Sequence, residues 1–316
     1  MGPRELTAIE RAEQRTIRTS RDVAISYEVI GSGDRTLMLA NGLGGRLYSW
    51  EPLLDALSDR YRMITWDYRG LFDSPCDAVC RLSVRDHAED ALRILDAEGV
   101  DRAVWVGWSM GVQVSLEAAA IGPDRFAGLV LMNGTYGHVF ASGFQPWFRL
   151  PLLPRYLHEV TEWVRNKPRV SRLLARTSKQ GTYVTLGLFW LVVGRRALTL
   201  RPAFQQYTDD VYKPENFPNF LRLFQELDAH SAYHHLPRIH VPALVISGRF
   251  DILTPAYQSR EITRRLPRAE HVHVRNGSHF VLLERPDQVL PRIETFLEGK
   301  AEWEPSPVAT SADGLR

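Results

Sequence analysis

The chain has 316 residues, of which 44% are hydrophobic and 24% are charged, the balance of a soluble globular protein large enough for one α/β domain with an insertion. Its formal net charge is only +2, and its 39 basic residues are spread along the chain, which argues against a nucleic-acid partner. Neither a secretory signal in residues 1–20 nor a membrane span is expected, since the longest apolar stretch, 183–194, is about half the length needed.

Residues 16–133 alternate strand-like and helix-like segments, which is typical of a mostly parallel sheet covered on both faces. In chain order, we expect an outer strand at 23–30, a strand at 36–40, a helix at 50–57 with Ser49 as N-cap, a strand at 62–66, a helix that Ser83 opens and Gly99 stops, and strands at 102–106 and 128–132.

The alternation then stops for about a hundred residues that are dense in aromatic side chains, and it resumes with strands at 243–246 and 271–274 and helices at 257–266 and 286–297. The simplest account is one sheet interrupted by an insertion. The resulting domain prediction is an N-terminal extension at 1–19, a core at 20–134 and 240–298, an insertion at 135–239, and a tail at 299–316 whose composition favours disorder.

One pentapeptide, Gly107-Trp108-Ser109-Met110-Gly111, stands between the strand at 102–106 and a helix-like segment at 112–120. A G-x-S-x-G sequence at a strand-to-helix junction is typical of a nucleophile elbow. The turn is so tight that its flanking positions must lack side chains, and the serine is held on a strained backbone with its hydroxyl above the sheet. Ser109 is therefore the candidate nucleophile.

A serine hydroxyl needs a base to remove its proton, and the base needs an orienting acid. Asp251 follows the strand at 243–246 and is the candidate acid, and His279 follows the strand at 271–274 and is the candidate base. The order Ser…Asp…His is that of α/β-hydrolases rather than of the serine proteases. Asp251 could instead be a turn or helix-cap residue, and His279 a structural histidine.

The oxyanion of an attacked carbonyl also needs hydrogen-bond donors. The backbone N–H of Met110 is one candidate, because it begins the helix after the serine. The other is the N–H of Leu43, in the glycine-bearing loop Asn-Gly-Leu-Gly-Gly at 41–45, where the main chain can approach a substrate closely.

Together the loop at 41–45, Asp-Tyr-Arg-Gly at 67–70, the pentapeptide, Asp251 and His279 make the chain resemble the α/β-hydrolase superfamily, in its capped branch. The resemblance covers about 20–134 and 240–298. Two departures stand out. The first loop begins with Asn41 where the family usually has His, and we expect Asn to shape the loop by hydrogen bonding. Leu71 and Phe72 follow Gly70 where a further Gly is usual, and we expect Phe72 to reshape the floor of the pocket.

The resemblance implies that the insertion forms a lid over Ser109 and lines the substrate pocket. On that basis the substrate-binding residues are predicted to be Trp108, Phe280, Phe189 and Trp190. The insertion's aromatic residues could equally be its own core. These residues are Trp147, Phe148, Trp163, Phe189, Trp190, Phe204, Phe217, Phe220 and Phe224.

The expected function is hydrolysis of hydrophobic, uncharged carboxylic esters through an acyl-enzyme, by a monomer or homodimer that needs no cofactor and no metal. A lactonase, a carbon–carbon bond hydrolase or a perhydrolase could use the same residues. A ligand receptor on a hydrolase scaffold is the alternative of another class. Cys76 and Cys80 are interpreted as free thiols in a reducing cytoplasm, because no second Cys or His pair completes a metal site with them.

Overall fold

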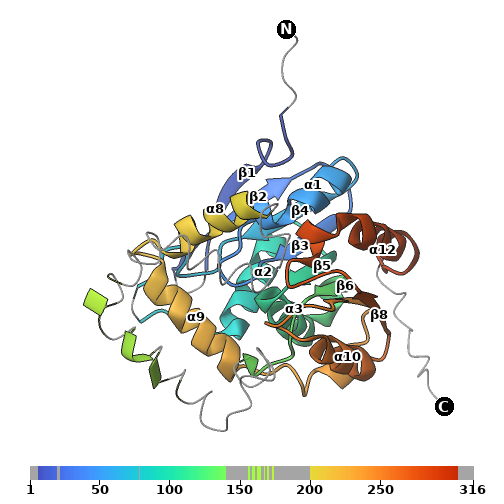
Figure 1. Cartoon of the computed structure of the whole chain (residues 1–316). Coiled ribbons are helices and arrows are strands. Elements are labelled where there is room, and N and C mark those ends of the chain that lie inside the picture. The colour runs from blue at the N-terminus through green and yellow to red at the C-terminus, as the bar shows by residue number, and fades with distance from the viewer. Residues whose placement is uncertain are drawn as a thin grey trace, which may run out of the picture.

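The computed structural model describes residues 6–19, 22–77, 79–139 and 200–304, with scattered positions between 156 and 173. Within these residues lies an eight-stranded sheet in the order β1-β2-β4-β3-β5-β6-β7-β8 (Figure 1). The strands are β1 (Glu13–Arg18), β2 (Ala24–Ile30), β3 (Thr36–Ala40), β4 (Arg62–Trp66), β5 (Ala103–Trp108), β6 (Phe126–Met132), β7 (Ala243–Gly248) and β8 (Ala269–Val274).

In the order of the sheet, each strand from β4 onward, including β3, pairs in parallel with the next. The pairs β1–β2 and β2–β4 are antiparallel. Central strands such as β6 are buried at every position, as expected for strands covered on both faces. The predicted mostly parallel, doubly wound sheet is therefore confirmed. Its parallel strands bring their carboxyl ends, and the loops that follow them, to one edge of the sheet.

Helices cover both faces of the sheet (Figure 1). One apolar cluster joins it to α2 (Val84–Ala97), α3 (Met110–Ile121) and α10 (Ala256–Arg265), and another joins it to α1 (Glu51–Leu57), α11 (Val281–Glu284) and α12 (Pro286–Gly299). Along β5, Trp105 belongs to the first cluster and Val104 and Val106 to the second. This division follows because successive side chains of a strand point to opposite faces.

The described helices of the predicted insertion are α8 (Arg201–Val211) and α9 (Phe217–Ala229). Gly137 and Ser231 form an isolated antiparallel bridge, so the chain leaves the core and returns to it at neighbouring points. The Tyr207 hydroxyl on α8 donates to the Leu43 carbonyl at 3.1 Å, and the Asn219 amide on α9 donates to the Gly70 carbonyl at 2.9 Å. Both helices therefore pack on loops at the carboxyl edge of the sheet.

Of the two serines predicted to begin helices, one caps its helix and the other does not. Ser83 caps α2 as expected, in a capping box with Asp86. Ser49 does not cap α1, because it lies inside a 3-10 turn, η1 (Leu47–Trp50), that moves the helix start to Glu51. Its backbone N–H already donates within that turn, to the Arg46 carbonyl. Two further 3-10 turns lie in the described part of the chain, η2 (Pro123–Arg125) and η5 (Leu236–Arg238).

At both ends of the chain, the core includes residues that were predicted to lie outside it. The predicted extension at 1–19 contains β1, which pairs with β2 along its whole length. Its side chains are almost all exposed, so it carries no apolar alternation that could have marked it as a strand. Residues 300–304 of the predicted disordered tail are placed in the structure, because the Trp303 indole donates to the Leu297 carbonyl at 3.0 Å and packs on Tyr61.

The prediction of free thiols is wrong for this structure, in which Cys76 and Cys80 form a disulfide. The Cys80 N–H donates to the Asp77 carbonyl at 3.3 Å, and this turn leaves the two Cα atoms 5.9 Å apart, a usual separation for bonded cysteines. Across the described residues, no helix combines the length and the apolar character that crossing a membrane requires. The cytoplasmic location stays a prediction.

Candidate active site

The turn between β5 and α3 holds Ser109 at φ 57° and ψ −114°, in the left-handed region that residues other than glycine rarely occupy. A Cβ on Gly107 would lie 2.5 Å from the Gly111 carbonyl oxygen, and a Cβ on Gly111 would overlap the Ala40 carbonyl. Both flanking positions therefore require glycine for steric reasons. The Ser109 N–H donates to the Met132 carbonyl at 3.0 Å, which ties the turn to the end of β6.

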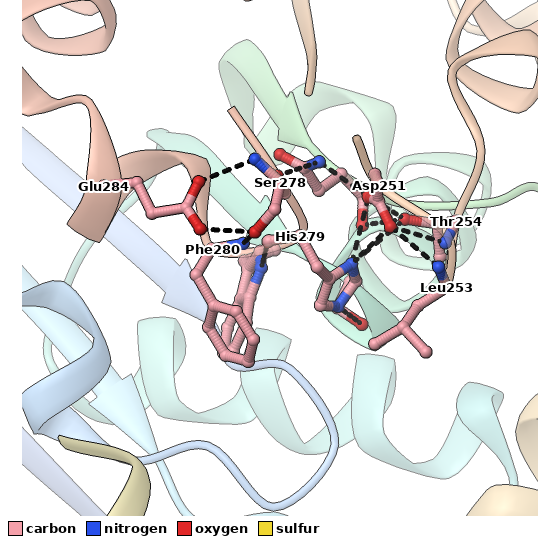
Figure 2. Close-up of polar contacts among 10 residues, drawn as sticks. Asp251, Leu253, Thr254, Ser278, His279, Phe280 and Glu284 are labelled. Carbon is pink, nitrogen blue, oxygen red and sulfur yellow. Dashed lines mark hydrogen bonds and ion pairs between the residues drawn. The ribbon is translucent and has the colours of Figure 1, made fainter. Parts of the chain in front are cut away.

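Three predicted site residues meet above this turn. The Nε2 atom of His279 lies 3.0 Å from Ser109 Oγ, and its Nδ1 atom lies 3.0 and 3.1 Å from the two carboxylate oxygens of Asp251 (Figure 2). Asp251 and His279 are both buried. The residues are far apart in sequence and meet because β5, β7 and β8 end at the same edge. One continuous hydrogen-bonded chain runs from the serine hydroxyl through the imidazole to the carboxylate.

The Asp251 carboxylate accepts hydrogen bonds from several directions. The backbone N–H groups of Leu253 and Thr254 donate to Oδ1 at 3.0 and 2.8 Å. The Thr254 hydroxyl lies 2.7 Å from Oδ2, and the Asn133 amide donates to the same oxygen at 2.6 Å. A buried carboxylate needs such donors to remain charged. The sequence analysis did not identify Asn133 and Thr254 as partners of Asp251, because no local motif marks either residue.

The segment that carries His279 is fixed on both sides (Figure 2). The Ser278 N–H donates to Glu284 Oε2 at 2.6 Å, and the Ser278 hydroxyl donates to Oε1 of the same side chain. The Trp108 indole N–H donates to the His279 carbonyl at 2.9 Å. Because these bonds hold the backbone, the imidazole needs little reorganisation to lie between Ser109 and Asp251. The sequence reasoning missed Glu284, which no local motif marks.

Asn41 shapes the first loop, as predicted from its hydrogen-bonding capacity. Its amide donates to the Trp66 carbonyl at 2.7 Å and accepts from the Trp50 indole N–H at 2.6 Å. The Tyr68 hydroxyl donates to the Asn41 carbonyl at 2.6 Å. The loop then turns through Gly44, which has φ 73°. Leu43, two residues after Asn41, is only partly buried.

Met110 is the first residue of α3, so its N–H belongs to the group of helix N-terminal donors that have no partner within the helix. These N–H groups carry the positive end of the helix dipole, which favours a developing negative charge beside Ser109. Leu43 and Met110 remain the predicted oxyanion donors.

Phe72 does not line the pocket described below. It adopts φ 51°, its N–H donates to the Asn216 side chain at 3.0 Å, and its ring lies 4.8 Å from the Arg46 guanidinium. The expected effect on the pocket floor is therefore wrong. Phe72 instead joins the loop after β4 to the residue that precedes α9, a long-range contact that local sequence could not indicate.

An apolar pocket lies beside Ser109 and His279 and is lined by their chain neighbours Trp108 and Phe280. The two rings pack together with centroids 5.4 Å apart. The other lining residues are Leu200, Ala203, Phe204 and Tyr207 from the insertion and Tyr48, Ser49 and Leu283 from the core. Trp108 and Phe280 are thus placed where a substrate contact was predicted. Phe189 and Trp190, like Trp147 and Phe148, lie outside the described residues.

The other described aromatic residues of the insertion differ in their surroundings: Phe217 and Phe220 pack within it, Phe224 packs against the main core cluster, and Trp163 is 55% exposed. Phe217 is buried in a small cluster with Val164 and Leu221, and its ring stacks on that of Phe220. Phe204 alone of the predicted set lines the apolar pocket within the described residues. The insertion therefore combines an internal core with a pocket wall, which is the arrangement that both interpretations anticipated.

Two carboxyl groups, Glu28 on β2 and Asp67 after β4, lie beneath the first loop beside Arg46. Burial raises the pKa of Asp67 to about 6, even though Arg46 opposes the shift. Burial, followed by the charge of Asp67, raises the pKa of Glu28 to about 7. Both pKa values exceed the ordinary values of about 4, so ionisation of these groups opposes folding.

We therefore expect Glu28→Gln to stabilise the protein at alkaline pH. Wild-type stability should fall as the pH rises from about 4 to about 8, because the folded state must ionise Glu28 at a penalty. At pH 8 the variant should be more stable by on the order of 2 kcal/mol, and the difference should vanish near pH 4. Calorimetric Tm values at both pH values measure this, with Glu89→Gln on exposed α2 surface as the control. An equal gain at both pH values would contradict the explanation.

Comparison with known proteins agrees with this architecture. The family model described as the alpha/beta hydrolase fold matches residues 35–286. A relative from Stutzerimonas stutzeri, named as a candidate carbamate hydrolase (RutD), is 26% identical over 259 residues, which are 77% of this chain and 84% of that protein.

Two solved structures show the same fold. The enol-lactonase from Burkholderia xenovorans has a TM-score of 0.69 at 23% identity, and the match covers 90% of this chain and 100% of that chain. A thermophilic esterase from Thermogutta terrifontis has a TM-score of 0.71 at 19% identity, over 91% of this chain and 98% of that one. At these sequence identities, the similarity shows the fold alone.

Proposed function

The chain belongs to the alpha/beta hydrolase fold family, and from this premise we propose that it is a serine hydrolase that cleaves carboxylic esters of hydrophobic, uncharged substrates. The observation that carries the proposal is the hydrogen-bonded chain from Ser109 Oγ through His279 to Asp251, on an elbow whose glycines are sterically required. Ser109 is the proposed nucleophile, His279 the base and Asp251 the orienting acid.

In the proposed reaction, Ser109 Oγ attacks the ester carbonyl carbon while His279 Nε2 takes the hydroxyl proton. The carbonyl oxygen becomes an oxyanion, which the N–H groups of Leu43 and Met110 would stabilise. Collapse of this intermediate breaks the carbon–oxygen bond to the alcohol, and His279 returns the proton to the leaving oxygen. Water, activated by His279, then attacks the acyl-serine ester and releases the acid and the free Ser109 hydroxyl.

The apolar pocket favours esters over carbamates as substrates. A carbamate carries a nitrogen on the attacked carbonyl carbon, and a primary one would bring N–H donors that need acceptors when buried. The described surface of the pocket beside Trp108 and Phe280 is mostly apolar, and the hydroxyl groups of Tyr48, Ser49 and Tyr207 are the side-chain hydrogen-bond acceptors among its described lining residues. An acyl chain, by contrast, gains about 0.8 kcal/mol for each CH₂ group that leaves water. Lactones, and carbon–carbon bonds flanked by carbonyl groups, are alternative substrates, because the same nucleophile and base can cleave them.

The proposal is tested by hydrolysis of p-nitrophenyl esters from acetate to palmitate, alongside a p-nitrophenyl carbamate and an aliphatic lactone. Ester turnover that depends on Ser109 supports it, and the preferred chain length measures the pocket. Turnover of the carbamate or lactone without ester turnover would reassign the substrate class. Folded protein that turns over none of them would point to a ligand receptor instead.

Enlarging the pocket should shift the preferred acyl length. Phe204→Ala removes a ring from the pocket wall, and we expect kcat/KM for esters about two to three carbons longer than the wild-type optimum to rise about tenfold. Phe217→Ala is the matched control, since it removes an aromatic ring from the insertion's separate core. A chain-length profile that moves equally in both variants would show that loosening of the insertion, and not pocket volume, sets the preference.

A further inference from the structure

Asn133 lies at the carboxyl end of β6, between the loops that carry Asp251 and His279. It is fully buried and has φ 47°, a left-handed conformation that asparagine adopts more readily than most residues. Its N–H donates to the Ile246 carbonyl at 2.9 Å, and its carbonyl oxygen lies 2.7 Å from the Thr254 hydroxyl, whose single proton it shares with Asp251 Oδ2. The backbone of Asn133 is therefore tied to β7 and to the loop after it.

The Asn133 side chain donates in two directions. Its Nδ2 atom lies 2.6 Å from Asp251 Oδ2 and 3.0 Å from the Ser278 carbonyl oxygen. A carboxylate and a carbonyl can only accept, so the reversed amide would place oxygen against both. Among the described residues, no donor lies within hydrogen-bonding distance of Asn133 Oδ1. The amide thus serves as a double donor, a role that neither Asp nor an apolar residue could fill.

The second of these bonds reaches the residue before His279. Glu284 on α11 accepts hydrogen bonds from the Ser278 N–H and hydroxyl (Figure 2). The Asn133 amide donates to the carbonyl of the same residue. Asn133 binds Asp251 and the Ser278 carbonyl with the same nitrogen. Asn133 therefore links the acid to the segment that carries the base. The Thr254 hydroxyl also lies near both, 2.7 Å from Asp251 Oδ2 and 3.3 Å from His279 Nδ1.

We propose that Asn133 is a positioning residue, which holds the Asp251 carboxylate and the His279 segment so that Asp251 accepts from His279 Nδ1. The proposal rests on the proposed function, in which His279 becomes an imidazolium when it takes the Ser109 proton. At that moment Asp251 must be ionised and aligned with Nδ1. An amide N–H donated to a carboxylate favours its charged form and restrains its rotation. Asn133 therefore acts on the reaction through Asp251 rather than on the substrate.

A double-mutant cycle tests this coupling. Asn133→Ala should lower kcat for a p-nitrophenyl ester about 10- to 100-fold and leave KM within about threefold. In an Asp251→Ala background the same change should lower kcat by less than about threefold, because the carboxylate through which Asn133 acts is already absent. Equal losses in both backgrounds, or a change confined to KM, would overturn the proposal.

Two further variants separate positioning from packing. Asn133→Asp keeps the volume and tolerates the left-handed backbone. Beside Asp251 the new carboxyl group is either ionised and donates nothing, or shares one proton with Asp251 and removes the charge that His279 needs, so kcat should fall as for alanine. Asn216→Ala removes another buried amide, one that binds the Phe72 N–H, and its effect should be the same in both Asp251 backgrounds. Asn133→Asp with wild-type kcat would overturn the proposal even if the alanine variant fails to fold.

A spectroscopic readout keeps the proposal distinct from the proposed function. The proton on His279 Nδ1 is observable as a downfield ¹H resonance when it is hydrogen-bonded to a carboxylate. Asn133→Ala should shift or broaden this resonance, and Asn216→Ala should not. If no ester is hydrolysed but the resonance responds, the positioning role stands and the esterase function falls. If esters are hydrolysed through Ser109 and neither resonance nor kcat responds, the positioning role falls.

Discussion

Ser109→Ala is expected to lower kcat for p-nitrophenyl ester hydrolysis by at least about 10⁴-fold. The variant loses the atom that would form the acyl-enzyme, and only general binding and the oxyanion donors would remain to assist attack by water. Alanine is smaller than serine and keeps the tight turn free of clashes, so the fold should survive. Steady-state rates with the preferred ester, together with a thermal unfolding curve, measure both effects.

Ser115→Ala is the matched control for this variant. Ser115 is fully buried on α3, one and a half helical turns beyond the elbow, and has no role in the proposed reaction. Its replacement should leave kcat within about twofold of wild type. Ester hydrolysis by Ser109→Ala at more than about 1% of the wild-type rate would mean that another group is the nucleophile, or that the activity is not enzymatic.

The second large effect is expected for Asp251→Asn, which should lower kcat by about 10³- to 10⁴-fold with KM within about threefold. The amide has nearly the shape of the carboxylate but carries no charge to stabilise the imidazolium of His279. Its N–H group can also face Nδ1, which would leave the proton on Nε2 and prevent that atom from accepting the Ser109 proton. Parallel measurement of kcat and KM with one ester separates this loss from weaker binding.

Asp90→Asn provides the comparison for Asp251. Asp90 is a buried aspartate on α2 whose Oδ2 lies 2.7 Å from Arg69 Nε, away from Ser109 and His279. Removing its charge leaves the buried Arg69 with the more distant Asp86 carboxylate, 3.5 Å away, and should lower Tm, yet kcat per folded molecule should remain near wild type. If both variants lost kcat in proportion to stability, Asp251 would be a structural residue and the proposed acid would have to be sought elsewhere.

Much of the fold follows from local patterns in the sequence. β6 and β7 are uninterrupted apolar runs, and Ser83 with Asp86 forms a local cap, so each could be assigned from a few neighbouring residues. β1 could not, because its exposed, polar side chains leave only backbone pairing to define it. The same holds for the disulfide, since two cysteines four apart are bonded or free according to the turn between them.

The residues of the candidate site differ in the same way, because local sequence marks some of them and only the fold reveals the others. By itself, the sequence determined the elbow at Ser109 and the candidacy of Asp251 and His279, because each stands directly after a recognisable strand and the tight turn leaves room only for glycine. Their catalytic roles stay predictions that the variants above address. Only the tertiary structure decided that Asn133 and Glu284 hold the acid and the base. Asn133 stands 118 residues from Asp251 in sequence, and contacts across such distances depend on which strand ends lie side by side in the sheet.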